Sequence, residues 1–387
     1  MNVKSADRGS TRKRIAHLTS VHSPFDVRIF HKECKSIARA GYEVTLIACH
    51  EKDETRDGVR IRAVPKTPGR LSRMIRGVWN VYREAVRLDA DLYHFHDPEL
   101  LPVGLLLRMR GRVVVYDVHE DVSEDIARKH YIPKGFRRLS ARAVSLIETL
   151  SARLFSAVVP ATPTIARRFA SRHLRKVVLS NYPVLEEFHA ADPVAWPCRS
   201  PAIAYVGVMS RDRCIVEMAQ AMSLLPEGLQ ASLKLVGNFS PPSLVEELSV
   251  LKGWNRTQVM GILDRPGVAR VLADVRAGLV VLKPTPAFLA SIPIKMFEYM
   301  CAGIPVIASN FPGFAEVVDG AKCGLLVDPG DPRAIAQAIE FVLTHPDEAE
   351  EMGERGREAV VTKYNWASEE RKLIQLYGTL LDSPCAA

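Results

Sequence analysis

The chain has 387 residues, 47% of them apolar and 25% charged, so it is long enough for two domains and too apolar for a disordered protein. A basic N-terminus followed by a short, mixed apolar run does not fit a signal peptide, and no apolar stretch reaches the roughly 20 residues of a membrane span. Seven scattered cysteines without a C-x-x-C pair indicate a reducing cytosol and no structural zinc.

The net charge of +8 is unevenly distributed along the chain. Residues 1–190 hold 34 Lys/Arg and 21 Asp/Glu, a balance of +13, whereas residues 191–387 hold 18 and 23, a balance of −5. This asymmetry predicts that the first half faces an anionic membrane surface or a nucleic acid. A membrane is favoured, because the sequence lacks a nucleic-acid recognition signature and a basic stripe with stacking aromatics.

Short β-branched runs alternate with helical patterns through the first half of the chain. Strands are expected over 14–21, 43–49, 60–65, 91–96, 112–119, 157–162 and 176–181. This alternation predicts a parallel sheet covered by helices on both faces. The acidic triplet Asp89-Ala90-Asp91 lies before a strand, the wrong end of such a sheet for a ligand, so we interpret it as a helix stop.

The same alternation restarts after a Pro-rich interval over 182–201. Six further strands are expected over 202–208, 231–237, 256–263, 277–284, 304–309 and 323–329. The prediction is a pair of doubly wound α/β domains, whose ligands bind at the C-terminal ends of the strands. The expected divisions are a flexible basic tail (1–14), a first domain (15–185), a second domain (186–365) and a C-terminal helix (366–387) that packs back on the first domain.

The segment SIPIKMFEYMCAGIPVIASNFPGF (291–314) contains one carboxylate, Glu298, among mostly apolar residues. A helix that starts near Pro293 and ends near Gly303 places Glu298 beside an apolar stripe, close to the positive helix end. There a carboxylate is suited to accept two vicinal ribose hydroxyls, and a diphosphate can rest on the free N–H groups of the helix start. The alternative is a surface glutamate that only complements the helix dipole.

This segment resembles the nucleotide-sugar site of glycosyltransferase family 4, retaining enzymes of GT-B fold. The pattern P-x-K-x-F-E-Y-M-x-A-G-x-P-V-I-A-S is typical of the branch that builds bacterial surface polysaccharides. The similarity extends through SPFDVRIFHKECKSIARAGYEV, LYHFHDPELLPVG, VVVYDVHED, AYVGVMSRDRC, GLLVDPGDPRAIAQAI and KYNWASEE. It implies two Rossmann-like domains facing a central cleft and a UDP- or GDP-linked sugar donor, with no metal and no other cofactor.

The resemblance also implies roles for individual residues. Arg213 and Lys295 stabilise the leaving diphosphate, and His119 lies near the transferred sugar. The residues expected to bind the nucleotide-sugar are Gly207, Ser291, Pro293, Glu298 and Glu316. The candidates for acceptor binding are Asp26, Arg28, Asp97, Glu99 and Glu120.

Several of these residues have structural alternatives. The alternative for His119 is a partly buried structural histidine. The alternative for Asp97 and Glu99 is a turn of the chain at the proline between them. The alternative for Asp26 and Arg28 is a helix cap and a surface arginine.

Three positions depart from the family pattern. Ala290 stands where many members carry a second glutamate, so contacts to the sugar fall to backbone groups or to Ser291. Val208 stands where members often have an arginine, and Cys214 follows Arg213 where the branch commonly has glycine. The phosphate clamp then rests on Arg213 with Lys295 or Arg211.

Two basic amphipathic stretches, 69–88 and 128–147, place Arg and Lys beside Trp79, Tyr82 and Phe136, as in helices of a membrane interface. An ordinary solvated helix face is the alternative. We expect a cytoplasmic hexosyltransferase, attached to the inner face of the cell membrane, that extends a lipid-linked glycan in surface polysaccharide biosynthesis, with no nucleic-acid partner. The rival interpretations are a non-catalytic, membrane-docked homologue and a nucleotide-sugar epimerase.

Overall fold

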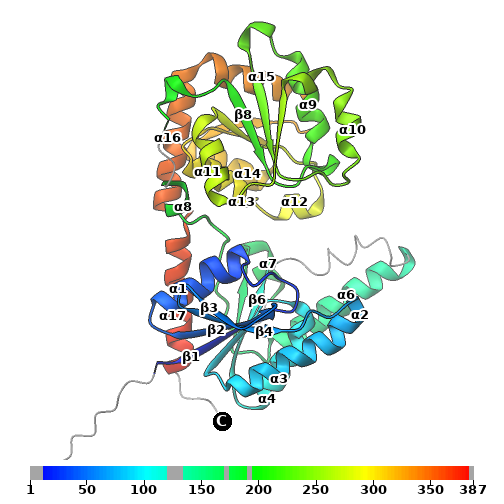
Figure 1. Ribbon diagram of the computed structural model, residues 1–387, viewed down its shortest axis with the longest axis vertical. Coiled ribbons are helices and arrows are strands. Elements are labelled where there is room, and N and C mark those ends of the chain that lie inside the picture. The colour runs from blue at the N-terminus through cyan, green and yellow to red at the C-terminus, as the bar shows by residue number, and fades with distance from the viewer. Residues whose placement is uncertain (1–11, 120–133, 170–173, 190–193, 383–387) are drawn as a thin grey trace, which may run out of the picture. The chain divides into compact units, whose positions relative to one another are not determined.

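The computed structural model describes residues 12–119, 134–169, 174–189 and 194–382. The chain divides into two compact units. The first unit contains the described residues up to Asn181 and those from Glu369 onward, and the second unit is Tyr182–Ser368. Each unit is built around its own sheet, flanked by helices (Figure 1).

The sheet of the first unit has seven strands in the order β3-β4-β2-β1-β5-β6-β7. Only β3, at one edge, runs antiparallel to its neighbour. The strands are β1 (Arg14–Leu18), β2 (Glu43–Cys49), β3 (Glu54–Arg56), β4 (Val59–Val64), β5 (Leu92–Phe95), β6 (Val113–Val118) and β7 (Ala157–Pro160). Six of the expected strands are therefore confirmed, and the short polar strand β3 was not predicted.

The strand expected over 176–181 is wrong. Val158 N–H donates to Arg175 O at 2.9 Å, Val177 N–H donates to Val158 O at 3.2 Å, and Leu179 N–H donates to Pro160 O at 3.1 Å. The next bond of a parallel ladder would need an N–H on Pro160, which proline lacks. The segment consequently follows β7 but forms only an isolated bridge.

Helices cover both faces of this sheet, and each face has its own hydrophobic core. One core includes α3 (Val78–Leu88) and α4 (Leu101–Met109), and the other includes α1 (Lys35–Arg39) and α17 (Trp366–Asp382) (Figure 1). The remaining helices of the unit are η1 (Val27–Cys34), α2 (Arg70–Ser72), η2 (Arg73–Gly77), η3 (Pro98–Leu100), α6 (Lys134–Ala152) and α7 (Pro163–Arg168). Asp89 ends α3 in a left-handed conformation, which confirms the helix stop.

The C-terminal helix α17 contributes apolar side chains to the core of the first unit. Leu373, Leu376 and Tyr377 pack in the same cluster as Ile15 and Val115. At the start of this part of the helix, Glu369 accepts a hydrogen bond from Ser180 N–H at 3.0 Å.

The sheet of the second unit is entirely parallel, in the order β10-β9-β8-β11-β12-β13. All six strands predicted for this half are confirmed: β8 (Ala202–Val206), β9 (Ser232–Val236), β10 (Thr257–Gly261), β11 (Ala277–Val280), β12 (Val306–Ser309) and β13 (Gly324–Val327). The helices and turns around them are α8 (Glu186–His189), η4 (Trp196–Cys198), η5 (Arg211–Arg213), α9 (Ile215–Leu224), η6 (Glu227–Leu229), α10 (Leu244–Ser249), η7 (Lys252–Arg256), α11 (Arg265–Asp274), α12 (Pro286–Ala290), α13 (Ile294–Cys301), α14 (Pro312–Ala321), α15 (Pro332–Thr344) and α16 (Pro346–Thr362).

Helix α13 lies unusually close to its sheet. A Cβ on Gly278 of β11 would come within 2.2 Å of the Tyr299 ring, so the glycine makes room for that ring. The Tyr299 hydroxyl accepts a hydrogen bond from Val206 N–H at 2.9 Å. The ring and its hydroxyl thereby fix the helix against the C-terminal end of β8, where the predicted nucleotide residues lie.

Candidate active site

Two cations of the second unit meet at the glycine that follows β8. Gly207 has a φ of 131°, and a Cβ there would lie 3.2 Å from Lys295 Nζ and 3.3 Å from Arg213 NH1. Arg213 ends the short turn η5, and Lys295 is the second residue of α13. The structure therefore brings together Gly207, Arg213 and Lys295, as the sequence predicts.

Neither cation has a carboxylate within 4 Å among the described residues. Lys295 is 7% exposed, and its ammonium lies over the Tyr205 ring, 3.7 Å from the centroid, without a hydrogen-bond partner in the described part of the chain. Burial and the neighbouring Arg213 lower the pKa of Lys295, while Glu298 opposes this shift. Arg213 makes one long hydrogen bond, to Val208 O at 3.4 Å. A buried amine beside a second cation favours an anion between them.

Glu298 is buried rather than exposed, so the surface-glutamate alternative is wrong. It is 4% exposed, and its Oε1 accepts a hydrogen bond from Arg265 NH1 at 2.6 Å. Arg265 also donates from Nε to Glu187 Oε2 at 2.9 Å. The sequence analysis missed Arg265, although a charged residue just after a predicted strand was the available signal.

The start of α13 provides uncapped main-chain donors. Pro293 is the N-cap residue and gives no side-chain hydrogen bond to the helix. The loop expected before this helix contains α12, and Ser291 is exposed with its hydroxyl donating to Ala287 O at 2.8 Å. Glu316 is exposed on α14. The guanidinium of Arg211 pairs with Glu247 of α10, so in this structure it does not join Arg213 and Lys295 at Gly207.

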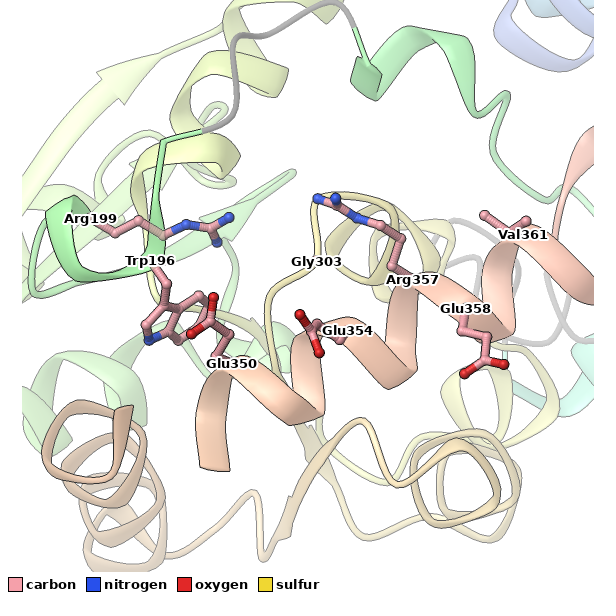
Figure 2. A pocket seen from close by; sticks show the side chains of 8 residues that line it. All are labelled: Trp196, Arg199, Gly303, Glu350, Glu354, Arg357, Glu358 and Val361. Carbon is pink, nitrogen blue, oxygen red and sulfur yellow. The ribbon is translucent and has the colours of Figure 1, made fainter. Parts of the chain in front are cut away.

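A separate pocket of about 410 Å³ lies at the other end of α13, around Gly303 (Figure 2). Arg199 and Arg357 extend toward one another above it, and α16 lines it with glutamates (Figure 2). Arg199 rests on the Trp196 ring, 4.8 Å from the centroid. None of the predicted site residues lines this pocket, so it is distinct from the Gly207 site.

In the first unit, the two carboxylates after β5 hold the loop that follows β1. Asp97 is 2% exposed, and its Oδ2 accepts hydrogen bonds from Thr19 Oγ1 at 2.8 Å and Ser20 N–H at 2.6 Å. Glu99 accepts from Ser20 Oγ at 2.7 Å and from Arg73 Nε at 3.1 Å. Both side chains therefore organise this loop through several bonds.

Asp26 caps η1, but Arg28 does not lie on the surface. Asp26 accepts hydrogen bonds from Arg28 N–H at 2.8 Å and Ile29 N–H at 2.9 Å. Burial alone would raise the pKa of Asp26, but bonds from His22 and these N–H groups bring it well below its usual value. Arg28 is 4% exposed and donates to Asp117 and to Leu179 O, so the surface-arginine alternative is wrong, and its place near the acceptor stays a prediction.

His119 belongs to a network of histidines at the C-terminal ends of β1, β5 and β6. Its Nε2 lies 3.0 Å from Asp117 Oδ2 and 3.1 Å from His96 Nδ1. His96 Nε2 lies 2.9 Å from His17 Nδ1, and His17 Nε2 lies 3.2 Å from the Tyr377 hydroxyl of α17. Sequence reasoning missed these partners, and Glu120 lies outside the described residues.

The ring nitrogens of His96 and His119 and a carboxylate oxygen of Asp117 are close enough together to hold a metal ion. However, Arg28 donates to both oxygens of Asp117, at 3.1 Å from Nε and 3.0 Å from NH2. A fixed guanidinium at this carboxylate opposes a second cation. Hydrogen bonding therefore accounts for the contacts without a metal ion.

Comparison with known families gives two matches that follow the two units. Residues 27–181 match the glycosyl transferase 4-like domain, and residues 191–359 match glycosyl transferases group 1. Alpha-maltose-1-phosphate synthase of Mycolicibacterium smegmatis is 26% identical over 186 residues, 46% of this chain and 47% of that one. The capsular polysaccharide biosynthesis glycosyltransferase CapM of Staphylococcus aureus is 25% identical over 180 residues, 46% of each chain. The chain thus spans about half the length of these relatives.

Solved structures match over nearly the whole chain. Sucrose-phosphate synthase from Thermosynechococcus elongatus has a TM-score of 0.75 at 21% identity and covers 95% of this chain and 99% of that one. Anabaena HepE, solved in complex with UDP and glucose, has a TM-score of 0.72 at 15% identity and covers 95% and 100%. The expected GT-B fold is thereby confirmed.

Proposed function

Since its two halves match glycosyltransferase family models and the chain has the GT-B fold, we propose that it transfers a sugar from a nucleotide-sugar donor to a glycan acceptor. The observation that carries this proposal is the buried amine of Lys295 beside Arg213 at Gly207, which has no hydrogen-bond partner among the described residues. Two cations to which the described part of the chain brings no carboxylate within 4 Å suit the diphosphate of such a donor.

The chemistry of sugar transfer explains why these cations are placed in advance. Breaking the bond between the anomeric carbon and the diphosphate builds negative charge on the leaving group. Fixed cations and the uncapped start of α13 stabilise that charge without reorganisation during the reaction. We infer from the family resemblance that the transfer is retaining, uses a hexosyl donor and needs no metal ion.

Glu298 is suited to hold the ribose of the same nucleotide. Arg265 binds its Oε1, which fixes the carboxylate on the buried side of α13. We infer that Oε2 accepts the ribose hydroxyls, so that Arg265 and Glu187 set the orientation of the nucleoside.

The acceptor is inferred to be a lipid-linked glycan that binds the first unit at an anionic membrane. Leu71, Ile75 and Trp79 are 73%, 64% and 58% exposed on the helical stretch 70–88. Arg76 and Arg83 are exposed on the same stretch, three residues before and four after Trp79, so charge and apolar surface share one face.

Part of the expected membrane face is corrected by the structure. Tyr82 is buried and its hydroxyl accepts from Arg110, so it does not take part, and the Phe136 side chain lies outside the described residues. On α6, Leu139, Leu146 and Ile147 are between 57% and 65% exposed and form a second set of exposed apolar side chains. No helix in the part of the chain that the structure describes is long and apolar enough to cross a bilayer. We propose peripheral attachment at the inner face of the cell membrane, in the synthesis of a surface polysaccharide.

A transfer assay with UDP- and GDP-sugars, with and without lipid-diphosphate-linked glycans, tests the proposal. Product that requires both donor and acceptor is the expected result. Nucleotide binding without turnover would indicate the non-catalytic homologue, which the substitutions at Val208, Cys214 and Ala290 favour. Conversion of the donor sugar without an acceptor would indicate an epimerase.

A further inference from the structure

The Asp117 carboxylate is buried and held rigidly by one guanidinium. Asp117 and Arg28 are 0% and 4% exposed, and Arg28 donates one hydrogen bond to each carboxylate oxygen. The Arg28 NH1 group also donates to Leu179 O at 2.8 Å, which anchors the guanidinium to the main chain. Burial alone would raise the pKa of Asp117, but Arg28 and His119 bring it well below its usual value. The group is therefore an ionised carboxylate in a fixed orientation.

An ionised carboxylate accepts hydrogen bonds and donates none. His119 Nε2 and His96 Nδ1 lie 3.0 and 3.2 Å from the same oxygen, Oδ2. We assign a hydrogen to each of these nitrogens, since a ring lone pair directed at the carboxylate would be repelled. The 3.1 Å approach of His96 Nδ1 to His119 Nε2 is then a contact between two donors that share Oδ2, and not a hydrogen bond. In a neutral imidazole with hydrogen on Nε2, the other nitrogen, Nδ1, keeps its lone pair.

The buried histidines His17 and His94 also place the hydrogen of His96 on Nδ1. Burial lowers the pKa of His17, His94 and His96, so the three rings are neutral and carry one N–H each. With hydrogen on His96 Nδ1, its Nε2 accepts from His17 Nδ1–H at 2.9 Å.

The direction of hydrogen bonding then continues to the C-terminal helix. His17 Nε2 accepts from the Tyr377 hydroxyl at 3.2 Å, and that oxygen accepts from His94 Nδ1–H at 2.6 Å. The buried carboxyl of Glu33 lies 3.9 Å from His17 Nδ1 and 3.8 Å from His94 Nδ1, and burial and the neighbouring Asp117 raise its pKa. Among the histidines of this array, one lone pair, on His94 Nε2, has no partner in the described part of the chain. The opposite direction would leave a buried N–H there and a lone pair of His96 against Asp117, which costs more.

We propose that Asp117, clamped by Arg28, is a positioning residue that holds His119 with its hydrogen on Nε2 and presents the Nδ1 lone pair as an acceptor for a hydroxyl group of a sugar substrate. The side chain of His119 is 16% exposed, while Asp117 and His96, which its Nε2 contacts, are buried. None of the described residues forms a hydrogen bond with Nδ1. The assignment of hydrogen positions stands on the geometry of this unit, whereas the sugar hydroxyl rests on the proposed function.

A metal ion is the competing explanation for the same contacts, and it predicts the opposite tautomer. A metal bound to His119 would use the Nε2 lone pair and leave the hydrogen on Nδ1. The position of one hydrogen atom thus separates the two explanations.

Nitrogen-15 NMR of the full-length, histidine-labelled protein in EDTA, at about pH 8.5 where histidines are neutral, measures this position directly. The His119 signal is identified by its loss in His119→Gln. We expect hydrogen on Nε2 and an unprotonated Nδ1. Hydrogen on Nδ1, or a stoichiometric shift of the His96 and His119 nitrogens on adding zinc, would overturn the proposal.

Steady-state kinetics of Asp117→Asn test whether the positioning of His119 by Asp117 matters for sugar transfer. Because an amide offers only one acceptor oxygen to three donors at Oδ2, we expect kcat to fall about a hundredfold, with the donor KM changed less than about threefold. The control is Asp53→Asn, which alters an exposed aspartate paired with Arg62 in the same unit and should leave both constants unchanged.

Unchanged kcat in folded Asp117→Asn would contradict the positioning role. UDP binding, which the proposed function assigns to the second unit, should persist in this variant. A wild-type protein that binds no nucleotide and transfers no sugar would refute the proposed function while leaving the tautomer measurement valid. If Asp117→Asn does not fold, the tautomer of His119 measured in the wild-type protein decides whether Asp117 has the positioning role.

Discussion

The charged residues at the strand ends of the two units are treated in opposite ways. In the second unit, Lys295 is buried without a hydrogen-bond partner among the described residues, and Arg213 makes one long bond to a carbonyl. In the first unit, Arg28 and Asp97 are even more deeply buried, but each is bound by several fixed groups. The charge of Lys295 and Arg213 is therefore left uncompensated by the described residues, whereas the charges of Arg28 and Asp97 are compensated within the first unit.

This difference indicates what each unit is built to do. An uncompensated buried cation costs free energy, which a ligand anion recovers when it binds. A fully bonded cluster gains little from a charged ligand but holds its outermost group, His119, in one orientation. The second unit is thus arranged to bind an anion, and the first to present a fixed side chain.

The largest effect is expected where charge is uncompensated. Arg213→Ala should lower kcat by about 10² to 10³ and raise the donor KM much less, because leaving-group charge is greatest in the transition state. Steady-state kinetics with the preferred nucleotide-sugar measure this, with Arg211→Ala as the control, since Arg211 pairs with Glu247 instead. A change confined to KM would show that Arg213 only holds the donor. Added chelator should have no effect.

The loss of the proposed membrane attachment, which we assign to the first unit, should be the next largest effect. Each basic residue near an anionic leaflet contributes about 1 kcal/mol, so Arg76→Gln with Arg83→Gln should weaken binding to anionic vesicles roughly thirtyfold. Sedimentation with vesicles measures this, and binding should fall further as salt shortens the screening length from about 10 Å at 0.1 M to about 3 Å at 1 M. Arg270→Gln with Arg333→Gln, exposed on the second unit, is the control. A wild-type protein that ignores anionic vesicles at low salt would refute the attachment.

Glu298→Gln should weaken nucleotide binding about tenfold, because the amide accepts fewer hydrogen bonds from a ribose and from Arg265. Calorimetric titration with nucleoside diphosphates measures the loss. Glu187→Gln also weakens the hold on Arg265 but leaves the α13 carboxylate intact, so it should cost less. Equal losses in the two variants would assign the effect to Arg265 rather than to the ribose.

The smallest effect is expected for Asp26, the N-cap of η1 in the first unit. Asp26→Ala should destabilise the first unit by about 1 kcal/mol at neutral pH, the usual cost of a lost N-cap. Because the pKa of Asp26 is lowered on folding, its contribution is present above the ordinary aspartate pKa and lost as pH falls through the folded value. Denaturation of both proteins at pH 7 and at about pH 3 checks this. If the difference in unfolding free energy between the wild type and Asp26→Ala is as large at about pH 3 as at pH 7, Asp26 does not act as a charged cap.

The sequence predicted the sheet of the second unit well because buried parallel strands are short apolar runs with clear ends. It failed at 176–181, where Pro160 of the neighbouring strand interrupts the ladder, which pattern alone does not reveal. The pairing of Glu298 with Arg265 depends on the spatial order of strands and helices, so neither residue's position in the sequence predicts its partner. In contrast, the polar residues that alternate along β5 and just beyond its end, His94 and His96, were a visible sign of the buried network.

Diphosphate binding beside Lys295 is the central element of the proposed function. A calorimetric comparison of UDP with uridine, or of GDP with guanosine if that is the donor base, tests it directly. In the wild-type protein the diphosphate should bind much more tightly than the nucleoside. In Lys295→Met, which keeps the length of the side chain without its charge, most of that difference should disappear while nucleoside affinity is unchanged. Equal affinity changes for nucleoside and nucleoside diphosphate, or none for either, would contradict the assignment of Lys295 to the phosphate site.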